Sequence, residues 1–494
     1  MQAFHTFAAE RWFLSVSRRE VATELPQTEE KRTARTTTPT TTAESVWSVF
    51  GGIAQTTGAT NLGQGFPNWS PPPFATQSLM ETVDSPNHQY TRPAGHPALV
   101  RALAEEYSKH LDRDIDGFEE IAVTVGASQA LYLALRLYSE VGDEVIVMEP
   151  FFDLYLKQIQ LTGASAKYIK LGGTGVSSEK DPWAIDFDKL ESMINEKTRL
   201  FVLNSPHNPT GKVLTKSDQE KIATILRKYP NIIVLADEVY KHTVYNPVES
   251  GDSSSIGHFH FAKLPDMYDR TITIGSCGKT FGATGWQVGW MVGPNHLIKP
   301  VHNYLPCVQF CTSTPMQEAL AKTIQVANRP FQGATSYYEW LRLQFKTKRE
   351  MLEDGLLAAG IEPLPSQGGF FVMAKLPDLD VSEYDDLDEP RDWKLCRKIA
   401  KVYNIVGIPA SSFFSPGYEI EFGPLARFAF CKTDDTLKEA RRRCFEGAGK
   451  RVIDVSENSD NGVVTAREGD QCAAEAYVKM LSGDGKQKKK MYYL

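Results

Sequence analysis

Short apolar runs alternate with amphipathic helical patterns through the middle of the chain, and this alternation restricts the fold more than any other feature. Strands buried on both faces have near-continuous apolar sequences, and helices between them cover both faces of a mostly parallel sheet. We therefore expect an α/β fold. The candidate strands are residues 121–125, 144–148, 200–203, 232–235, 271–274 and 290–292.

Two helix starts are predicted from capping residues. Ser128 can cap a helix that follows the run 121–125, and Ser217 with Glu220 forms a candidate capping box for another. The free amides and the positive dipole end of the first helix, at Gly126, Ala127 and Ser128, suit a phosphate. An ordinary strand, turn and helix without a ligand explains the same pattern.

Changes in composition divide the chain into five segments. Residues 1–45 form an extension in which aromatic residues and arginines resemble a mitochondrial presequence, although Glu10 and Glu20 favour a dispensable, disordered extension. Residues 46–85 are an N-terminal arm that belongs partly to a small domain. Residues 86–325 form a large domain, residues 326–448 a smaller α+β domain, and residues 449–494 a polar, solvated tail.

Overall composition narrows the class of protein. The chain has 494 residues and a net charge of −7 without a basic stripe, so nucleic acid is not expected as a partner. No apolar run approaches the roughly 18 residues that a membrane span needs. The seven cysteines are scattered and lack metal-ligand spacing, so we expect no metal and a reducing compartment. A cytoplasmic location is predicted, with the mitochondrion as the open alternative.

One lysine has the surroundings of a nucleophile. Lys279 follows the strand candidate 271–274 among glycine, serine and threonine residues, where a lysine can be desolvated and aimed. Most lysines are solvated surface charges. The stretch 275–290, however, resembles the cofactor-lysine motif of fold-type I aminotransferases, which use pyridoxal 5'-phosphate (PLP). That resemblance implies a large domain with a mostly parallel seven-stranded sheet, and a smaller α+β domain.

Two further motifs fit this chemistry. Asp237 follows a strand candidate directly, where its carboxylate can pair with the pyridinium nitrogen of PLP, although an Asp at a strand end is often only a helix cap. Tyr240 can donate to the phenolic oxygen of the ring. The turn 204–212 is characteristic of the family, and the resemblance assigns Asn208 to the same oxygen and to the substrate.

Arg427 lies in an otherwise apolar strand candidate. A buried arginine is costly unless it is paired, and a substrate α-carboxylate is a natural bidentate partner. An internal salt bridge is the alternative. The resemblance makes Arg427 the residue that binds the substrate carboxylate, and it makes Phe152 the aromatic ring stacked on the cofactor; otherwise Phe152 is a core residue.

The resemblance supplies the remaining site residues. Stretch 61–74 is similar to the arm of kynurenine/glutamine-type aminotransferases, which implies that Gly65 and Trp47 line the substrate pocket. Tyr90 would reach the cofactor phosphate of a neighbouring subunit, and a homodimer follows. Ser276 would bind the phosphate. Where the family places Arg or Lys against that phosphate, this chain has Gln287, so we predict weaker retention of PLP.

These residues together predict a homodimeric enzyme that carries out ping-pong transamination. The expected donor is kynurenine, glutamine or another bulky or aromatic L-amino acid, and the acceptor is a 2-oxo acid. A cysteine-S-conjugate β-lyase on the same site is one alternative. A non-catalytic sensor with the same fold is another, and it predicts the loss of the lysine or the carboxylate.

Overall fold

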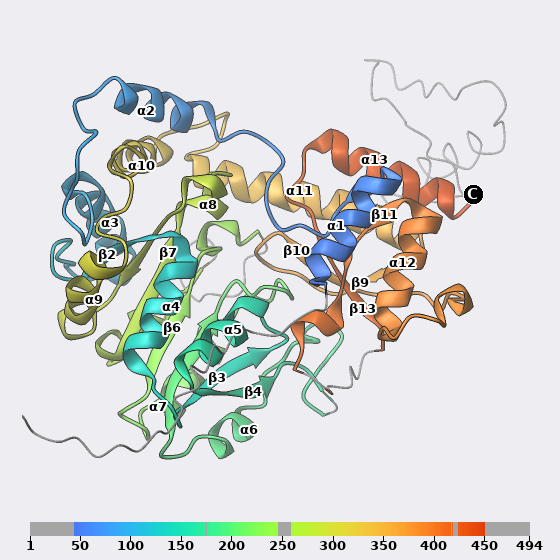
Figure 1. Ribbon diagram of the computed structural model, residues 1–494, viewed down its shortest axis with the longest axis horizontal. Helices are drawn as coiled ribbons and strands as arrows, with labels where there is room; N and C mark the ends of the chain where they lie inside the picture. Colours follow the sequence, from blue (N-terminus) through green and yellow to red (C-terminus); the bar gives the residue numbers. More distant parts are fainter. Residues whose placement is uncertain (1–43, 174, 246–257, 416, 418–422, 450–494) are drawn as a thin grey trace, which may run out of the picture. The chain divides into compact units, whose positions relative to one another are not determined.

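The computed structural model describes residues 44–173, 175–245, 258–415, 417 and 423–449 (Figure 1). Contacts separate Met1–Glu44 from Ser45–Leu494, and the second of these is one compact unit. Within it, we refer to the parts built on the seven-stranded and the four-stranded sheets as the large and the small domain. The expected targeting function of the N-terminal extension and the expected solvated tail concern residues that lie outside the described ranges, apart from residues 44, 45 and 449.

A seven-stranded sheet forms the centre of the large domain, in the order β2-β8-β7-β6-β5-β3-β4. Strands β3 to β7 pair in parallel, whereas β8 runs antiparallel to both of its neighbours. The expected α/β fold is confirmed. The strands are β2 (Ile121–Val125), β3 (Glu144–Glu149), β4 (Ser165–Lys170), β5 (Thr198–Asn204), β6 (Ile233–Asp237), β7 (Thr271–Ser276) and β8 (Val288–Val292).

Alternate side chains of the central strands enter two different cores. In β3, Val145 and Val147 pack on the side of helices α4, α5 and α9, whereas Ile146 and Met148 pack on the side of α6 and α7. Figure 1 shows α4 and α5 in front of the sheet. Large-domain helices are α2 (Pro73–Val83), α3 (Pro97–Leu111), α4 (Gly126–Tyr138), α5 (Asp153–Thr162), α6 (Phe187–Ser192), α7 (Lys216–Leu226), α8 (Cys277–Thr280), α9 (Asn295–Val308) and α10 (Thr314–Ala327).

Both predicted helix caps are wrong in position. Helix α7 begins earlier than a cap at Ser217 would allow, with Thr215 as its cap and Asp218 completing the capping box. The cap lies two residues earlier because the Thr215 hydroxyl accepts from the amide of Asp218 and the Asp218 side chain accepts from the amide of Thr215. Helix α4 begins at Gly126 without a side-chain cap, so Ser128 lies inside its first turn. The N-cap residue Val125 makes no side-chain cap bond to the first amides of α4, although the Gln129 side chain accepts from the amide of Val125 at 2.7 Å.

The small domain contains a four-stranded sheet, β12-β13-β10-β9, and a parallel pair, β1-β11. The pair joins the N-terminal arm to the C-terminal part of the chain, as Thr60 lies opposite Ile405. Its strands are β1 (Thr60–Asn61), β9 (Glu362–Pro363), β10 (Phe371–Lys375), β11 (Ile405–Val406), β12 (Ile408–Pro409) and β13 (Leu425–Ala429). Its helices are α1 (Val46–Thr57), α11 (Tyr337–Ala358), α12 (Arg391–Tyr403) and α13 (Asp434–Gly447).

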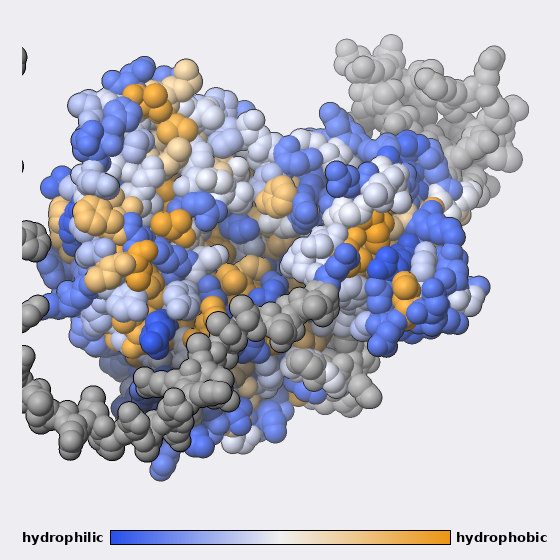
Figure 2. All heavy atoms as spheres, in the orientation of Figure 1, coloured by the Kyte–Doolittle hydropathy of each residue, from blue (hydrophilic) through white to orange (hydrophobic). Residues whose placement is uncertain are grey.

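The surface shown in Figure 2 is largely hydrophilic, with small separated groups of apolar residues. Among the described residues, no helix combines the length and the apolar character that crossing a bilayer requires. Two aromatic side chains stand out in solvent: Tyr90 is 81% exposed and Phe310 is 51% exposed, and their rings contact each other at 4.6 Å.

Candidate active site

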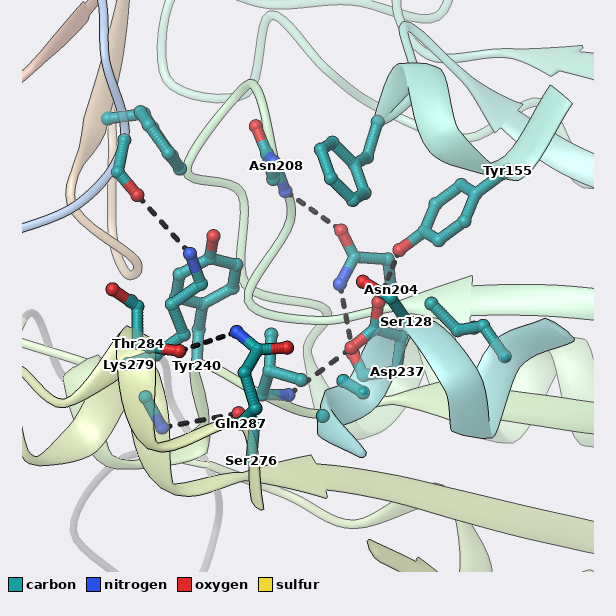
Figure 3. Close-up of a pocket in the computed structure, with 18 of the residues that line it drawn as sticks. Ser128, Tyr155, Asn204, Asn208, Asp237, Tyr240, Ser276, Lys279, Thr284 and Gln287 are labelled. Atoms are coloured by element: carbon teal, nitrogen blue, oxygen red, sulfur yellow. Dashed lines mark hydrogen bonds between the residues drawn. The ribbon is translucent and has the colours of Figure 1, made fainter. Parts of the chain in front are cut away.

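Lys279 lies one turn beyond the carboxyl end of β7, in the short helix α8. The Ser276 hydroxyl accepts a hydrogen bond from the amide of Gly278 at 3.2 Å and so fixes the start of this turn. The Lys279 ammonium donates to the carbonyl of Gly65 at 3.2 Å (Figure 3). Burial lowers the pKa of Lys279, which increases the fraction of neutral, nucleophilic amine.

A pocket of about 210 Å³ surrounds this lysine (Figure 3). It lies beyond the carboxyl ends of the parallel strands, where α/β sheets bind ligands. The structure brings thirteen sequence-predicted residues to its lining; their functional roles stay predictions. They are Trp47, Gly65, Gly126, Ala127, Ser128, Phe152, Asn208, Asp237, Tyr240, Ser276, Lys279, Gln287 and Arg427. Tyr90 lies elsewhere, in the exposed contact with Phe310.

Asp237 ends strand β6 and is 4% exposed. Its carboxylate accepts a hydrogen bond from the Tyr155 hydroxyl at 2.5 Å and a longer one from the amide of Val239 at 3.4 Å. Burial raises the pKa of Asp237 to about 6, against the opposing effects of these bonds and of Lys279. The carboxylate is thus incompletely compensated, and a cationic group in the pocket would stabilise its charge.

Arg427 is 1% exposed in β13 and has no carboxylate hydrogen-bond partner among the described residues. It donates to the side-chain oxygen of Asn208 at 3.0 Å and to the carbonyl of Gly63 at 2.9 Å. Its Nε atom is buried without a partner. Because these partners are an amide and a backbone carbonyl oxygen, the described residues do not show the predicted alternative of an internal salt bridge. Burial lowers the pKa of Arg427 to about 10. The guanidinium can therefore accept an anionic ligand as a further partner.

Three aromatic rings surround the Arg427 guanidinium. Its central carbon lies 4.1 Å from the ring centre of Phe371, 4.7 Å from that of Phe413 and 5.2 Å from that of Trp47. The Trp47 indole also donates to Asp153 at 3.4 Å. Because the rings exclude water from the guanidinium, a charge-assisted bond to a carboxylate would be stronger here than in solvent.

The start of α4 forms the opposite end of the pocket. Gly126 has a φ of 70°, and a Cβ there would lie 3.0 Å from the Gln287 side-chain oxygen. The Gln287 amide donates to the carbonyl of Thr284 at 2.6 Å. Gln287 therefore faces the helix start that we predicted to bind phosphate, but its amide donor is already engaged in a local bond.

Tyr240, Phe152 and Asn208 complete the predicted set. Burial raises the pKa of Tyr240, so its hydroxyl stays a donor, and its ring centre lies 5.9 Å from the Lys279 nitrogen. The Phe152 ring meets Tyr155 edge-on at 5.7 Å. The amide of Asn208 donates to the side-chain oxygen of Asn204 at 2.9 Å, which fixes the turn.

Sequence reasoning missed several lining residues. Tyr155 lies within an amphipathic helix and is indistinguishable there from a core tyrosine, although it contacts Asp237 directly. Asn204 could have been found, because it opens the characteristic turn 204–212. The other missed lining residues are Leu131, Val239, Gly278, Thr284 and Phe371.

A second group of titratable side chains lies on the other side of β6. Glu238 accepts from His260 at 2.5 Å and is 3.3 Å from the nitrogen of His258, while the Lys241 ammonium contacts Glu106 at 2.6 Å. We refer to these residues, with His242, as the rear cluster. Ligand atoms of Glu238, His258 and His260 are close enough to hold a metal ion, but the carboxylate already has partners in both imidazoles.

Comparison with known proteins places this pocket in a family. Residues 57–443 match the family "Aminotransferase class I and II". The chain is 36% identical over 414 residues to kynurenine–oxoglutarate transaminase of Dictyostelium discoideum, covering 80% of this chain and 92% of the relative. It is 38% identical to human kynurenine–oxoglutarate transaminase 3, covering 80% and 86%.

Solved structures agree with this placement. The methionine aminotransferase YbdL of Escherichia coli superposes with a TM-score of 0.71 at 27% identity, covering 85% of this chain and 99% of YbdL. Bna3p of Saccharomyces cerevisiae superposes with a TM-score of 0.74 at 30% identity, covering 83% and 97%. Since the match spans both domains and the strand ends that carry the pocket, this chain belongs to the class I and II aminotransferase family.

Proposed function

We propose that this protein is a PLP-dependent transaminase that moves the amino group of a bulky or aromatic L-amino acid to a 2-oxo acid. The single observation that supports this most is the pocket that holds Lys279, Asp237 and Arg427, three buried ionisable groups whose charges are incompletely compensated. Such groups mark a site whose ligand supplies the missing charges. The names of the relatives favour kynurenine as the donor. Glutamine is the next candidate, because the stretch 61–74 resembles the arm of kynurenine/glutamine-type aminotransferases.

The residues present fit PLP. Lys279 would hold it through the side-chain nitrogen, and Asp237 would pair with the ring nitrogen. Tyr240 and Asn208 would donate to the phenolic oxygen, and Phe152 would cover the ring. The phosphate would lie at the uncapped start of α4, with Ser276 and Gln287, where Gly126 keeps a Cβ out of the way.

Each residue then has one task in the reaction. Bound PLP supplies an electron sink that stabilises negative charge at the substrate Cα. Once the substrate amine replaces it on the cofactor, the Lys279 nitrogen would take the proton from that Cα, because its lowered pKa favours the neutral amine, and would deliver it to the cofactor carbon. Arg427 orients the substrate α-carboxylate, and the rings of Trp47 and Phe371 exclude water beside it.

A homodimer is part of the proposal. Tyr90 is 81% exposed and lies apart from the pocket of its own chain, so its hydroxyl is available to a second copy. Its contact with the exposed ring of Phe310 keeps it in a defined orientation. The proposed partner of Tyr90 is the cofactor phosphate of that second copy.

The visible spectrum of the purified protein with PLP tests the proposal. We expect the absorption band of covalently bound PLP, its loss on addition of L-kynurenine and its return with 2-oxoglutarate. Lys279→Ala should lack this band and lose activity by at least about a thousandfold, since proton transfer by a positioned group contributes roughly 10²–10⁴. Release of pyruvate and thiol from a cysteine S-conjugate would instead establish β-elimination. Failure to form the band at saturating PLP would favour a sensor.

A further inference from the structure

Four consecutive backbone carbonyls, in residues 63–66 of the arm, each accept a hydrogen bond from a cationic side chain in the interior. We call this segment the carbonyl loop. The bonds join Arg427 to Gly63 at 2.9 Å, Lys432 to Gln64 at 2.9 Å and to Phe66 at 3.1 Å, and Lys279 to Gly65 at 3.2 Å. The carbonyl loop therefore connects the large domain, through Lys279, with the small domain.

Two of these three cations have other partners in the proposed reaction. Lys279 would bind the cofactor and Arg427 the substrate carboxylate, so both bonds to the carbonyl loop compete with ligands. Lys432 has no such competing role, because both of its hydrogen bonds go to the loop. Lys432 is 4% exposed and lies three residues beyond the end of strand β13 at Ala429.

The ends of the carbonyl loop are fixed independently of these cations. Leu62 exchanges backbone bonds with Val406 and Ala429, at 2.9 and 2.6 Å. The Asn68 side chain accepts from the amide of Thr433 at 2.7 Å. Between these anchors, the carbonyl oxygens depend on the three cations. Removal of one cation should therefore loosen the middle of the loop without unfolding the arm.

The carbonyl loop is also a wall of the pocket. A Cβ at Gly65 would lie 2.5 Å from the ring of Phe371, so the backbone packs directly on a ring that borders Arg427. A small displacement of Gly65 would change the space beside both the guanidinium and Lys279. The position of this backbone thus affects where a substrate carboxylate can bind.

We infer that Lys432 is a positioning residue for the substrate. Its ammonium holds the carbonyl loop in place as a pocket wall when Lys279 and Arg427 bind the cofactor and the substrate carboxylate. This inference rests on the proposed transaminase function. An ammonium suits the role because one nitrogen can donate to two neighbouring carbonyls at once.

Lys432→Met tests the inference, because methionine keeps the length of the side chain and removes its donors. In the PLP-loaded protein we expect KM for L-kynurenine to rise about tenfold and kcat to change less than about threefold, as for the loss of one net charge-assisted hydrogen bond in substrate binding. Hydrogen exchange of the amides of residues 63–66 should become faster, and more so with kynurenine bound.

Lys348→Met is the matched control. Lys348 is 8% exposed and donates to the backbone carbonyl of Lys432 at 2.9 Å and to Asp434, but not to the carbonyl loop. The same substitution there should lower stability and leave KM unchanged. If Lys432→Met does not fold, Lys432→Gln keeps a polar group of shorter reach and should still raise KM by about threefold.

Two failures are distinguishable. A wild-type protein that binds PLP but transfers no amino group contradicts the proposed function, and hydrogen exchange then still reports whether Lys432 holds the loop. A wild-type protein that transaminates, together with a Lys432→Met variant of unchanged KM and unchanged exchange at residues 63–66, overturns the inference about Lys432 alone.

Discussion

Asp237 and Glu238 are neighbours in the sequence and almost equally buried, at 4% and 3% exposure, yet their carboxyl groups behave in opposite ways. Burial raises the pKa of Asp237 to about 6. Burial acts on Glu238 in the same direction, but the imidazoles of His260 and His258 outweigh it and hold the pKa well below its usual range. Consecutive side chains at a strand end point to opposite faces of the sheet, so the two carboxylates meet different partners.

The difference separates a ligand site from a structural one. Glu238 finds its compensation inside the protein, in the rear cluster, and its charge is stable without any ligand. Asp237 has a hydroxyl and an amide as donors, neither of which carries a charge. Burial of a carboxylate therefore does not indicate a ligand site by itself. A buried carboxylate that lacks a compensating partner inside the protein does.

Asp237→Asn should have the largest effect on activity. We expect kcat/KM to fall by at least about a hundredfold, or roughly 3 kcal/mol, because an amide cannot keep a pyridinium nitrogen protonated. Stability at pH 8 should not fall. The folded pKa of Asp237 lies above its unfolded value, so its ionised form opposes folding as pH rises through about 6. Steady-state kinetics measure kcat/KM, and denaturant unfolding measures stability. A variant that is destabilised but active would contradict the assignment of Asp237 to a ligand site.

Glu238→Gln is the counterpart one residue later. Removing this charge leaves His258 and His260 buried without their carboxylate, and breaking a buried pair costs about 3 kcal/mol or more. We expect that loss in the free energy of unfolding at pH 8, with kcat/KM changed by less than about tenfold in the folded fraction. A loss of activity as large as that of Asp237→Asn, at unchanged stability, would show that the rear cluster takes part in the chemistry.

The acid sensitivity of the rear cluster gives the next smaller effect. Burial lowers the pKa of His242 to about 4, although Glu106 opposes this at 3.3 Å. Because the unfolded histidine takes up a proton first, stability is full above pH 6.5 and falls as pH drops toward 4. We expect His242 to remove about 2 kcal/mol between pH 8 and pH 5.

His242→Phe measures this contribution. The ring of His242 stacks on Tyr338 at 4.0 Å, and phenylalanine keeps that contact. The drop in the free energy of unfolding between pH 8 and pH 5, followed by urea denaturation, should be about 2 kcal/mol smaller than in the wild type. An unchanged drop would mean that burial does not lower the pKa of His242 in the folded protein.

Features that depend on a local sequence pattern were predictable from the sequence. Contacts between residues distant in the sequence were not. Strand β3 was predictable because its side chains alternate between two apolar cores, whereas β4 was missed because this edge strand is mostly half-exposed and mixes polar with apolar residues. Lys279, Asp237 and Arg427 stood out as charged residues at the ends of, or within, apolar runs. Tyr155 carried no such signal.

The rear cluster and the carbonyl loop were unpredictable for the same reason. Glu238 contacts a histidine 22 positions away in the sequence, and Lys432 contacts the carbonyl of Gln64, 368 positions away. Backbone carbonyls have no sequence signature at all. The positioning contacts, such as those between Lys432 and the carbonyl loop, are therefore found only from the three-dimensional structure.

Gln287→Lys should have the smallest effect and tests the other end of the pocket. The Gln287 amide is engaged with Thr284, so the start of α4 and Ser276 would face the proposed phosphate without an adjacent cation from position 287. We expect lysine to lower the dissociation constant of PLP by about three- to tenfold, since charge-assisted bonds are roughly twice as strong as neutral ones. The position is exposed, and solvent limits the gain.

Gln287→Glu is the control of equal size and opposite charge, and it should weaken PLP binding by a similar factor. Equilibrium dialysis of the three proteins at two salt concentrations separates charge from shape, because only the charge effect is screened. Equal retention of PLP by all three would mean that the phosphate does not face residue 287. In the opposite case, the pocket is incompletely compensated at both ends, at Asp237 and at the start of α4, whereas the Glu238 carboxylate of the rear cluster has its partners inside the protein.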